Sequence, residues 1–364
     1  MNFLIIKIRN WYGKFERPIS SISLIGGFVF DAIALKRIDL FWENFWIIVH
    51  LVVVAICIAL INIQEDKAID PKDPQKMNFW LINILQFFFG GLLSAYLVFY
   101  FRSTTLAVTW PFLLILSIAF IANESLKEHY ARLTFQISLF FLSLFACAIF
   151  IVPIIFHRIG PDIFLISGLT SLVVLFTFLI GLSFFAKEKF KQNKKILALS
   201  ILTIFFSINI LYFLNLIPPI PLSLKDGGIY HSLNRDDSGN YIVQYENTGW
   251  LDYFSMHENI HLPPGKPIYA YSAIFSPTTF NTDIVHEWQR YDKNTKTWIT
   301  ISEINLSVIG GRDGGYRTYS MKTEILPGKW RVNVKTFTRQ IIGRLRFNVT
   351  ETIDTKQILK TGIK

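Results

Sequence analysis

The sequence has 364 residues, of which 52% are hydrophobic and 17% are charged, and its formal net charge at pH 7 is +10. An average soluble domain is roughly 45–50% apolar and about 25% charged, so this composition is typical of a membrane protein and excludes intrinsic disorder and a disulfide scaffold. The positive charge is spread along the chain, which argues against nucleic acid as a partner.

Residues 1–217 contain apolar stretches long enough to cross a bilayer, which takes about 20 residues with a range of roughly 17–25. A short stretch, Ile19–Leu35, contains Asp31, and hydropathy alone leaves its status open. The others lack charge and have the full length: Phe45–Ile63, Phe79–Phe101, Leu106–Ala122, Leu133–Phe156, Ile163–Ala186 and Ile196–Ile217.

The positions of Lys and Arg decide the number of spans, because short cytoplasmic loops are enriched in these residues. With Ile19–Leu35 as a span and the N-terminus inside, 14 basic residues lie on the cytoplasmic side and 4 on the outer side. A six-span arrangement with the N-terminus inside gives 8 and 10, and one with the N-terminus outside gives 10 and 8. We therefore predict an α-helical bundle of about seven spans over residues 1–217, with the C-terminal region extracytoplasmic.

Two ionisable residues, Asp31 and His50, lie within predicted spans, where such residues are functional candidates by default. Both are near span ends, and no charged set recurs along several spans, as an ion pathway would require. One alternative function is nevertheless transport of a lipid or small solute. It predicts a polar cavity lined by Asp31, His50, Asn83 or Gln86.

The sequence changes character after Ile217. A Pro-rich exit opens a predicted connector over residues 218–240. Residues 241–350 then alternate apolar and polar side chains, which is typical of strands with one buried face, and residues 351–364 form a tail. We predict a small all-β antiparallel, sandwich-like domain with seven strands: Tyr241–Glu246, Pro267–Phe275, Asp283–Tyr291, Thr297–Ser302, Tyr316–Glu324, Lys329–Phe337 and Arg344–Val349.

One segment has the spacing of a zinc hydrolase. His257, Glu258 and His261 match H-E-x-x-H, which on a helix places two imidazoles on one face for zinc and a carboxylate to activate the bound water. However, Leu262–Gly265 ends any helix, and the neighbouring runs are β-type. A polar loop before a strand is the simpler interpretation, so we expect no metal or other cofactor.

Basic residues gather near the C-terminal end of this region. Arg312 and Arg317 border a Gly-rich turn, and Arg331, Arg344 and Arg346 lie on the outward faces of the last two predicted strands. Such a set is suited to phosphate head groups or anionic glycans, although a solvated face remains the simpler interpretation. His286 shares a strand face with Trp288 and is expected to be a hydrogen-bonded core residue.

Four short motifs follow one another over roughly residues 265–350. They are His286-Glu-Trp288, the Arg317–Lys322 pattern R-T-x-S-x-K, Gly328-x-Trp330-x-Val332, and Gly343-x-x-x-Phe347. This order resembles a bacterial family, the domain of unknown function 2914. The resemblance implies a bacterial origin and a small extracytoplasmic β-domain that often follows membrane segments. It implies no activity, cofactor or catalytic residue.

The sequence thus predicts a multi-pass protein of the bacterial inner membrane that presents a β-domain outside the cytoplasm. Its expected role is binding or envelope organisation, with the lipid bilayer and an anionic envelope component or a protein as partners. The oligomeric state stays open. The alternatives are the membrane-bound zinc metallohydrolase and the transporter.

Overall fold

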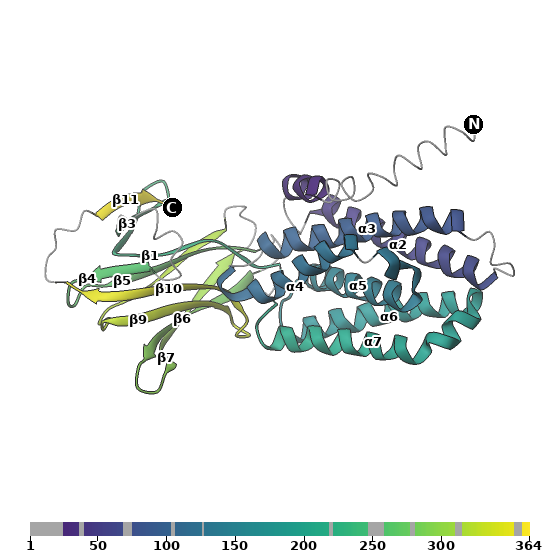
Figure 1. Ribbon diagram of the computed structural model, residues 1–364. Helices are drawn as coiled ribbons and strands as arrows, with labels where there is room; N and C mark the ends of the chain where they lie inside the picture. Colours follow the sequence, from purple (N-terminus) through teal and green to yellow (C-terminus); the bar gives the residue numbers. More distant parts are fainter. Residues whose placement is uncertain are drawn as a thin grey trace. The chain divides into compact units, whose positions relative to one another are not determined.

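The structure is a computed structural model that describes residues 25–35, 40–67, 75–102, 106–125, 127–217, 221–246, 258–276, 281–309, 315–352 and 359–364. The chain divides into two compact units. The helical unit comprises Met1–Arg102, Pro111–Phe156 and Asp162–Phe213, and the β unit comprises the remaining segments, chiefly Leu214–Lys364. Figure 1 shows both units and labels most of their helices and strands.

The described part of the helical unit begins with a short apolar helix, Ile25–Ala34. Six longer elements and one 3₁₀ turn follow: α2 (Phe41–Lys67), α3 (Gln75–Arg102), α4 (Leu106–Ser125), η1 (Lys127–Ala131), α5 (Leu133–Phe156), α6 (Pro161–Phe185) and α7 (Lys187–Phe213). Five of these, α2, α3, α5, α6 and α7, are long and apolar enough to cross a membrane. Ile25–Ala34 and the Trp110–Asn123 part of α4 are apolar but shorter.

Aromatic side chains and one glycine bring helices together. Helix α2 contacts α3, and α5 contacts both α2 and α7. At Gly168 in α6, an added Cβ would lie 2.9 Å from Cζ of Phe145 in α5 and 3.1 Å from Cε2 of Phe205 in α7. The two rings stack with their centroids 5.9 Å apart. A side chain larger than glycine at this position would therefore have to displace them.

Neutral amide side chains link the helices, as is common where helices pack in an apolar environment. Asn62 Nδ2 in α2 donates to Gln136 Oε1 in α5 at 2.6 Å, and Gln136 Nε2 donates to the Tyr130 carbonyl at 2.6 Å. Gln86 Nε2 in α3 donates to the Asn123 carbonyl of α4 at 3.0 Å. Side-chain hydrogen bonds between elements are thus present at Gln86 and Gln136.

The β unit contains all seven predicted strands, together with four that the sequence did not reveal. The predicted strands are β3 (Tyr241–Glu246), β5 (Ile268–Phe275), β6 (Asn281–Asp292), β7 (Thr297–Ile309), β8 (Tyr316–Lys322), β9 (Gly328–Thr336) and β10 (Ile341–Glu351). The additional strands are β1 (Ser223–Tyr230), β2 (Ser232–Arg235), β4 (Glu258–Leu262) and β11 (Leu359–Ile363). The range expected to be only a connector therefore holds β1 and β2, and the expected tail holds β11.

The strands form three sheets with the orders β1-β5-β8, β4-β10-β9-β6-β7 and β11-β3-β2. Neighbours are antiparallel except β4 and β10, which pair in parallel, so the expectation of a wholly antiparallel domain is wrong at this edge. Residues 258–262 are followed by a crossover of many residues before β10, which is what a parallel pair requires.

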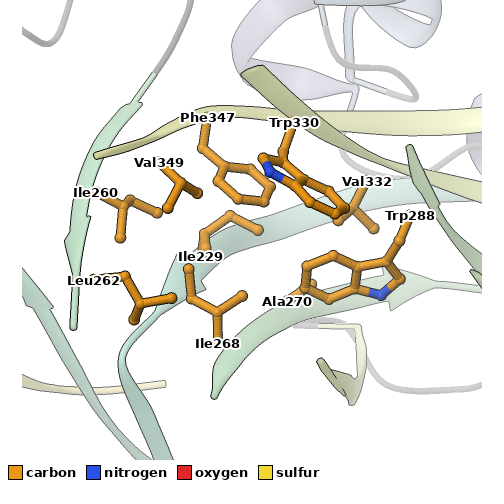
Figure 2. Close-up of a cluster of buried hydrophobic side chains, with 10 residues drawn as sticks. All are labelled: Ile229, Ile260, Leu262, Ile268, Ala270, Trp288, Trp330, Val332, Phe347 and Val349. Carbon is orange, nitrogen blue, oxygen red and sulfur yellow. The ribbon is translucent and has the colours of Figure 1, made fainter. Parts of the chain in front are cut away.

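The main core lies between the first two sheets. Figure 2 shows Ile229, Ile268 and Ala270 of β1 and β5 facing Trp288, Trp330 and Phe347 of the five-stranded sheet, and all six are buried. Trp288 and Phe347 meet edge to face with ring centroids 6.2 Å apart. Every second residue of β6, β9 and β10 thus points into this core, and the residues between them point to the opposite face.

Candidate functional site

Three of the five predicted basic residues lie together on the face of the five-stranded sheet opposite the core. Arg331 of β9 is paired with Arg346 of β10, and Arg344 is paired with Asn333. Because Trp330 and Phe347 point into the core, their neighbours point outward. We call Arg331, Arg344 and Arg346 the arginine face.

A buried polar network anchors two of these arginines, each through its own Nε atom. Arg331 Nε donates to Gln289 Oε1 at 2.6 Å, and Arg344 Nε donates to Asn333 Oδ1 at 2.6 Å. Asn333 Nδ2 in turn donates to Glu287 Oε2 at 2.6 Å and to Gln289 Oε1 at 3.1 Å. Gln289, Asn333 and Glu287 are all buried. The guanidinium groups are therefore held by partners that are themselves fixed.

Glu287 is the carboxylate at the centre of this network. It forms an ion pair with Lys335 and accepts hydrogen bonds from Asn333 and from Thr300 Oγ1, the latter at 3.2 Å. Burial raises its pKa, but the hydrogen bonds and the charge of Lys335 outweigh that effect, so the pKa lies below its ordinary value. Glu287 is thus ionised at neutral pH and compensates part of the positive charge.

The positive charge on the arginine face exceeds the nearby negative charge. Burial, followed by the charge of Arg344, lowers the pKa of Arg331 to about 10. Burial and the charge of Arg346 likewise lower the pKa of Arg344. With Lys329 and Lys335, five basic groups lie on this face, together with the carboxylates of Asp283, Glu287 and Glu303. The basic groups repel one another, so an added anion would stabilise the face.

The anchoring leaves the outer parts of two guanidinium groups available. Within the described ranges, the only side-chain hydrogen bonds of Arg331 and Arg344 are those of their Nε atoms. Arg331 also lies 4.2 Å above the centre of the Trp298 ring, which fixes its plane. Each Nη pair can therefore donate to an external acceptor, and a guanidinium fork matches phosphate and carboxylate oxygens.

The other two predicted basic residues are not part of this face. Arg317 lies on β8 in the three-stranded sheet, where its Nη1 donates to Asn240 Oδ1 at 3.2 Å. Arg312 lies outside the described residues. The polar anchors Glu287, Gln289 and Asn333 were not predicted as site residues, although they alternate with core residues on β6 and β9 in the same way as the arginines do.

The zinc interpretation requires a helix, and Glu258–Leu262 is the strand β4. In a strand, residues three apart such as Glu258 and His261 lie about 10 Å from each other along the chain and point to opposite faces, unlike in a helix. His257 lies outside the described residues. Across the parts of the chain that the structure describes, no group of three or more His, Cys, Asp or Glu side chains is placed to hold a metal ion.

His261 instead belongs to a carboxylate–histidine cluster that the sequence did not indicate. Glu246 lies within hydrogen-bond distance of His231 Nε2 at 2.9 Å and of His261 Nδ1 at 2.8 Å, and it accepts the His261 backbone N–H at 2.6 Å. Burial, followed by the charge of Glu246, raises the pKa of Glu258 to about 7. Glu258 is therefore close to half-protonated at neutral pH.

His286 is a core residue, as predicted. Its Nε2 lies 2.9 Å from Ser272 Oγ and its Nδ1 lies 2.8 Å from Ser320 Oγ, so both ring nitrogens have partners. Burial lowers its pKa to about 4. The imidazole is therefore neutral at physiological pH and joins β5, β6 and β8 within the core.

The helical unit contains a cavity of about 670 Å³. Its lining includes all four polar residues that the transporter alternative named, Asp31, His50, Asn83 and Gln86. Asp31 Oδ2 accepts a hydrogen bond of 2.5 Å from Ser94 Oγ of α3. The structure thus brings the predicted polar candidates of this unit into one place.

Comparison with known proteins adds one family match. Residues 281–349 match the model of the family described as "Protein of unknown function (DUF2914)". No curated protein matches the chain. A solved structure of the Pseudomonas fluorescens alkylpurine DNA glycosylase AlkC, bound to DNA containing an abasic site analog, aligns with 85% of this chain and 99% of its own length. The sequence identity is 8% and the TM-score is 0.21, too low to indicate a common fold. The C-terminal region from β6 to β10 therefore contains a segment similar to this domain of unknown function.

Proposed function

We propose that the protein is a multi-pass protein of the bacterial inner membrane that binds an anionic envelope component through the arginine face. In this proposal the β unit is a sandwich-like domain on the outer side of the membrane. The ligand carries phosphate or carboxylate groups, which are the acceptors that guanidinium forks match.

The observation that carries the proposal is the shared anchoring of Arg331 and Arg344. A surface arginine that only solubilises a sheet has no need of a buried partner for Nε, and long charged side chains are normally free to move. Here Gln289 and Asn333 fix both groups, so less conformational entropy is lost when a ligand binds. The excess positive charge supplies the attraction.

The membrane part of the proposal is supported by the helices and by the charge distribution. An apolar helix lies within each of the seven predicted segments, and five of them have the length of a span. The counts of 14 and 4 basic residues favour seven spans with the N-terminus in the cytoplasm. An odd number of spans then puts the β unit outside.

Binding is tested with pyrophosphate as a phosphate probe and citrate as a carboxylate probe, titrated into the full chain in a neutral detergent. We expect binding to the wild type and a loss of about tenfold or more for the double substitution Arg331→Gln and Arg344→Gln, because two charge-assisted hydrogen-bond donors are removed. Arg235→Gln removes the same charge from the exposed end of β2 and serves as the matched control. Equal affinity of the double variant and the control would overturn the proposal.

The location of the β unit is tested with two reporters fused at the C-terminus. Alkaline phosphatase is active only outside the cytoplasm, and a fluorescent protein that folds only in the cytoplasm reports the opposite side. We expect an active phosphatase and a dark fluorescent fusion. The reverse result would contradict the seven-span topology.

A further inference from the structure

The cavity of the helical unit suggests a second binding site, distinct in position and chemistry from the arginine face. Its walls come from the helix Ile25–Ala34, from α2 and α3, and from Phe120 and Asn123 of α4. Its volume of about 670 Å³ is within the range of roughly 300–1,000 Å³ that is typical of small-molecule sites. The side chains of its lining determine which class of ligand it would bind.

Apart from His50, the ionisable side chains of the described lining are carboxylates. Asp31 and Glu43 contribute two carboxylates. Among the described residues, the Ser94 hydroxyl is the side-chain donor to Asp31, and the Glu43 side chain has no hydrogen bond or ion pair. The described lining contains no Lys or Arg. A ligand that brings positive charge would therefore meet two carboxylates in this part of the lining.

Two further lining residues contribute hydrogen-bond acceptors. His50 Nδ1 donates to the Trp46 carbonyl at 2.8 Å, and in this tautomer Nε2 can accept a hydrogen bond. Gln86 Nε2 donates one N–H to the Asn123 carbonyl, and the Gln86 side-chain oxygen can still accept a hydrogen bond. Gly91 makes room for the imidazole, because a Cβ there would lie 3.0 Å from His50 Nε2. The lining thus calls for a ligand with N–H donors.

The rest of the lining is apolar and rich in aromatic rings. These rings are Phe28, Phe30, Trp42, Trp46, Phe87 and Phe120. Aromatic faces attract cations, Trp most strongly, and the same rings bury an apolar body. Carboxylates, free acceptors and aromatic walls together select one class of ligand.

We propose that this cavity binds an organic cation with an ammonium group on an apolar body, and that Asp31 is its counter-ion. The ammonium N–H groups would bond the Asp31 carboxylate and neighbouring acceptors, while the apolar body would lie against the aromatic walls. This proposal does not depend on the arginine face, which would attract ligands of the opposite charge.

The test uses 2-phenylethylammonium and two probes of similar shape, the neutral 2-phenylethanol and the anionic phenylacetate. Titrated into the wild-type full chain in a neutral detergent, the ammonium should bind about tenfold more tightly than the alcohol or more, and the anion should not bind, because the charge-assisted hydrogen bond is specific to the cation. Equal affinity for the ammonium and the alcohol would overturn the proposal without any variant.

Variants locate the site. Asp31→Asn keeps the shape of the side chain and removes its charge, and we expect it to weaken ammonium binding by about tenfold or more. Glu188→Gln removes an exposed carboxylate of α7 that is not part of the lining and should leave binding unchanged. If Asp31→Asn binds the probe as tightly as the Glu188→Gln control, Asp31 is not the counter-ion and the proposal fails.

The ammonium group can come from a lipid head group or from a free amine. Repeating the titration in nanodiscs of phosphatidylethanolamine and in nanodiscs without primary amines separates these sources. Weaker probe binding in the first assigns the site to the lipid head group, and equal binding in both assigns it to a soluble amine. Both results require the ammonium selectivity on which the proposal rests.

Discussion

The two units of this protein satisfy their buried polar groups in different ways. In the helical unit, neutral amides pair between helices, as Asn62 does with Gln136. In the β unit, a buried carboxylate, Glu287, interacts with charged and polar side chains on the outward face of one sheet. Neutral pairs cost little to bury in an apolar setting, whereas a charged network tolerates burial only when every member has a partner.

The difference extends to the two candidate sites. The described lining of the cavity contains two carboxylates and no Lys or Arg, while the sheet face with the three arginines also has two Lys, beside three carboxylates. The two proposed sites therefore concern ligands of opposite charge. The comparison predicts that removing a polar group should cost more stability in the β unit than in the helical unit.

The largest expected loss follows from Glu287→Ala. This change leaves Lys335 and Asn333 without their acceptor and removes the carboxylate that offsets the arginines. Breaking a buried ion pair from one side costs about 3–5 kcal/mol. Denaturant unfolding of the full chain, followed by the fluorescence of the buried Trp288 and Trp330, measures the loss. A cost below about 1 kcal/mol would show that the network is not structurally important.

A second effect depends on pH and arises at His286. The unfolded imidazole has a pKa of 6.5 and the folded one about 4, so the unfolded state binds more protons between these values. The contribution of neutral His286 to the free energy of unfolding is fully present above pH 6.5. It is lost as the pH falls toward 4, by about 3 kcal/mol in total. Glu258, whose pKa is raised to about 7, acts in the opposite direction over nearly the same range.

Because of this opposition, the His286 contribution is measured as a difference between the wild type and His286→Gln at pH 7 and pH 4. We expect the stability advantage of the wild type to shrink by about 3 kcal/mol at the lower pH. An advantage that does not change with pH would contradict a neutral, buried imidazole.

In the helical unit, we expect the largest loss of stability from a substitution at Gly168. Gly168→Ala adds a methyl group against Phe145 and Phe205, and overpacking of this kind costs about 1–3 kcal/mol. Gly181→Ala in the same helix meets nothing within 4 Å and is the control. Thermal unfolding in detergent compares the two, and equal melting temperatures would show that α5, α6 and α7 do not meet closely at Gly168.

The smallest expected effect is that of Gln136→Leu. It removes the acceptor of Asn62 and the donor to the Tyr130 carbonyl, and interhelical hydrogen bonds of this kind contribute about 0.6 kcal/mol on average and up to about 1.7. The same thermal measurement applies. A loss as large as that of Glu287→Ala would remove the distinction drawn between the two units.

Much of the β unit follows from the sequence because alternation is a local signal. Strands such as β9, with Trp330, Val332 and Val334 on one face, could be predicted along with the outward position of Arg331. Strand β1 could not, since Lys225-Asp-Gly-Gly228 has low strand propensity and is held by pairing with β5. Strand β4 was hidden because its residues also match a helical zinc motif.

The candidate sites could likewise be predicted from the sequence only in part. Arg331, Arg344 and Arg346 could be grouped from the sequence, because adjacent strands place alternating residues on one face. Their anchors Gln289 and Asn333 could not be recognised, since the register between β6 and β9, which pairs Gln289 with Arg331 and Glu287 with Asn333, is a tertiary property. The gathering of Asp31 and His50 at one cavity likewise depends on how the helices pack.

The central claim is that the arginine face binds anions through oriented guanidinium groups and not through positive charge alone. Arg344→Lys tests it most directly, because lysine keeps the charge but lacks both the Nε contact to Asn333 and the fork. Measured by pyrophosphate titration of the full chain at physiological salt, we predict that Arg344→Lys binds about tenfold more weakly than the wild type, while Arg235→Lys binds equally well. Unchanged affinity of Arg344→Lys would contradict the claim.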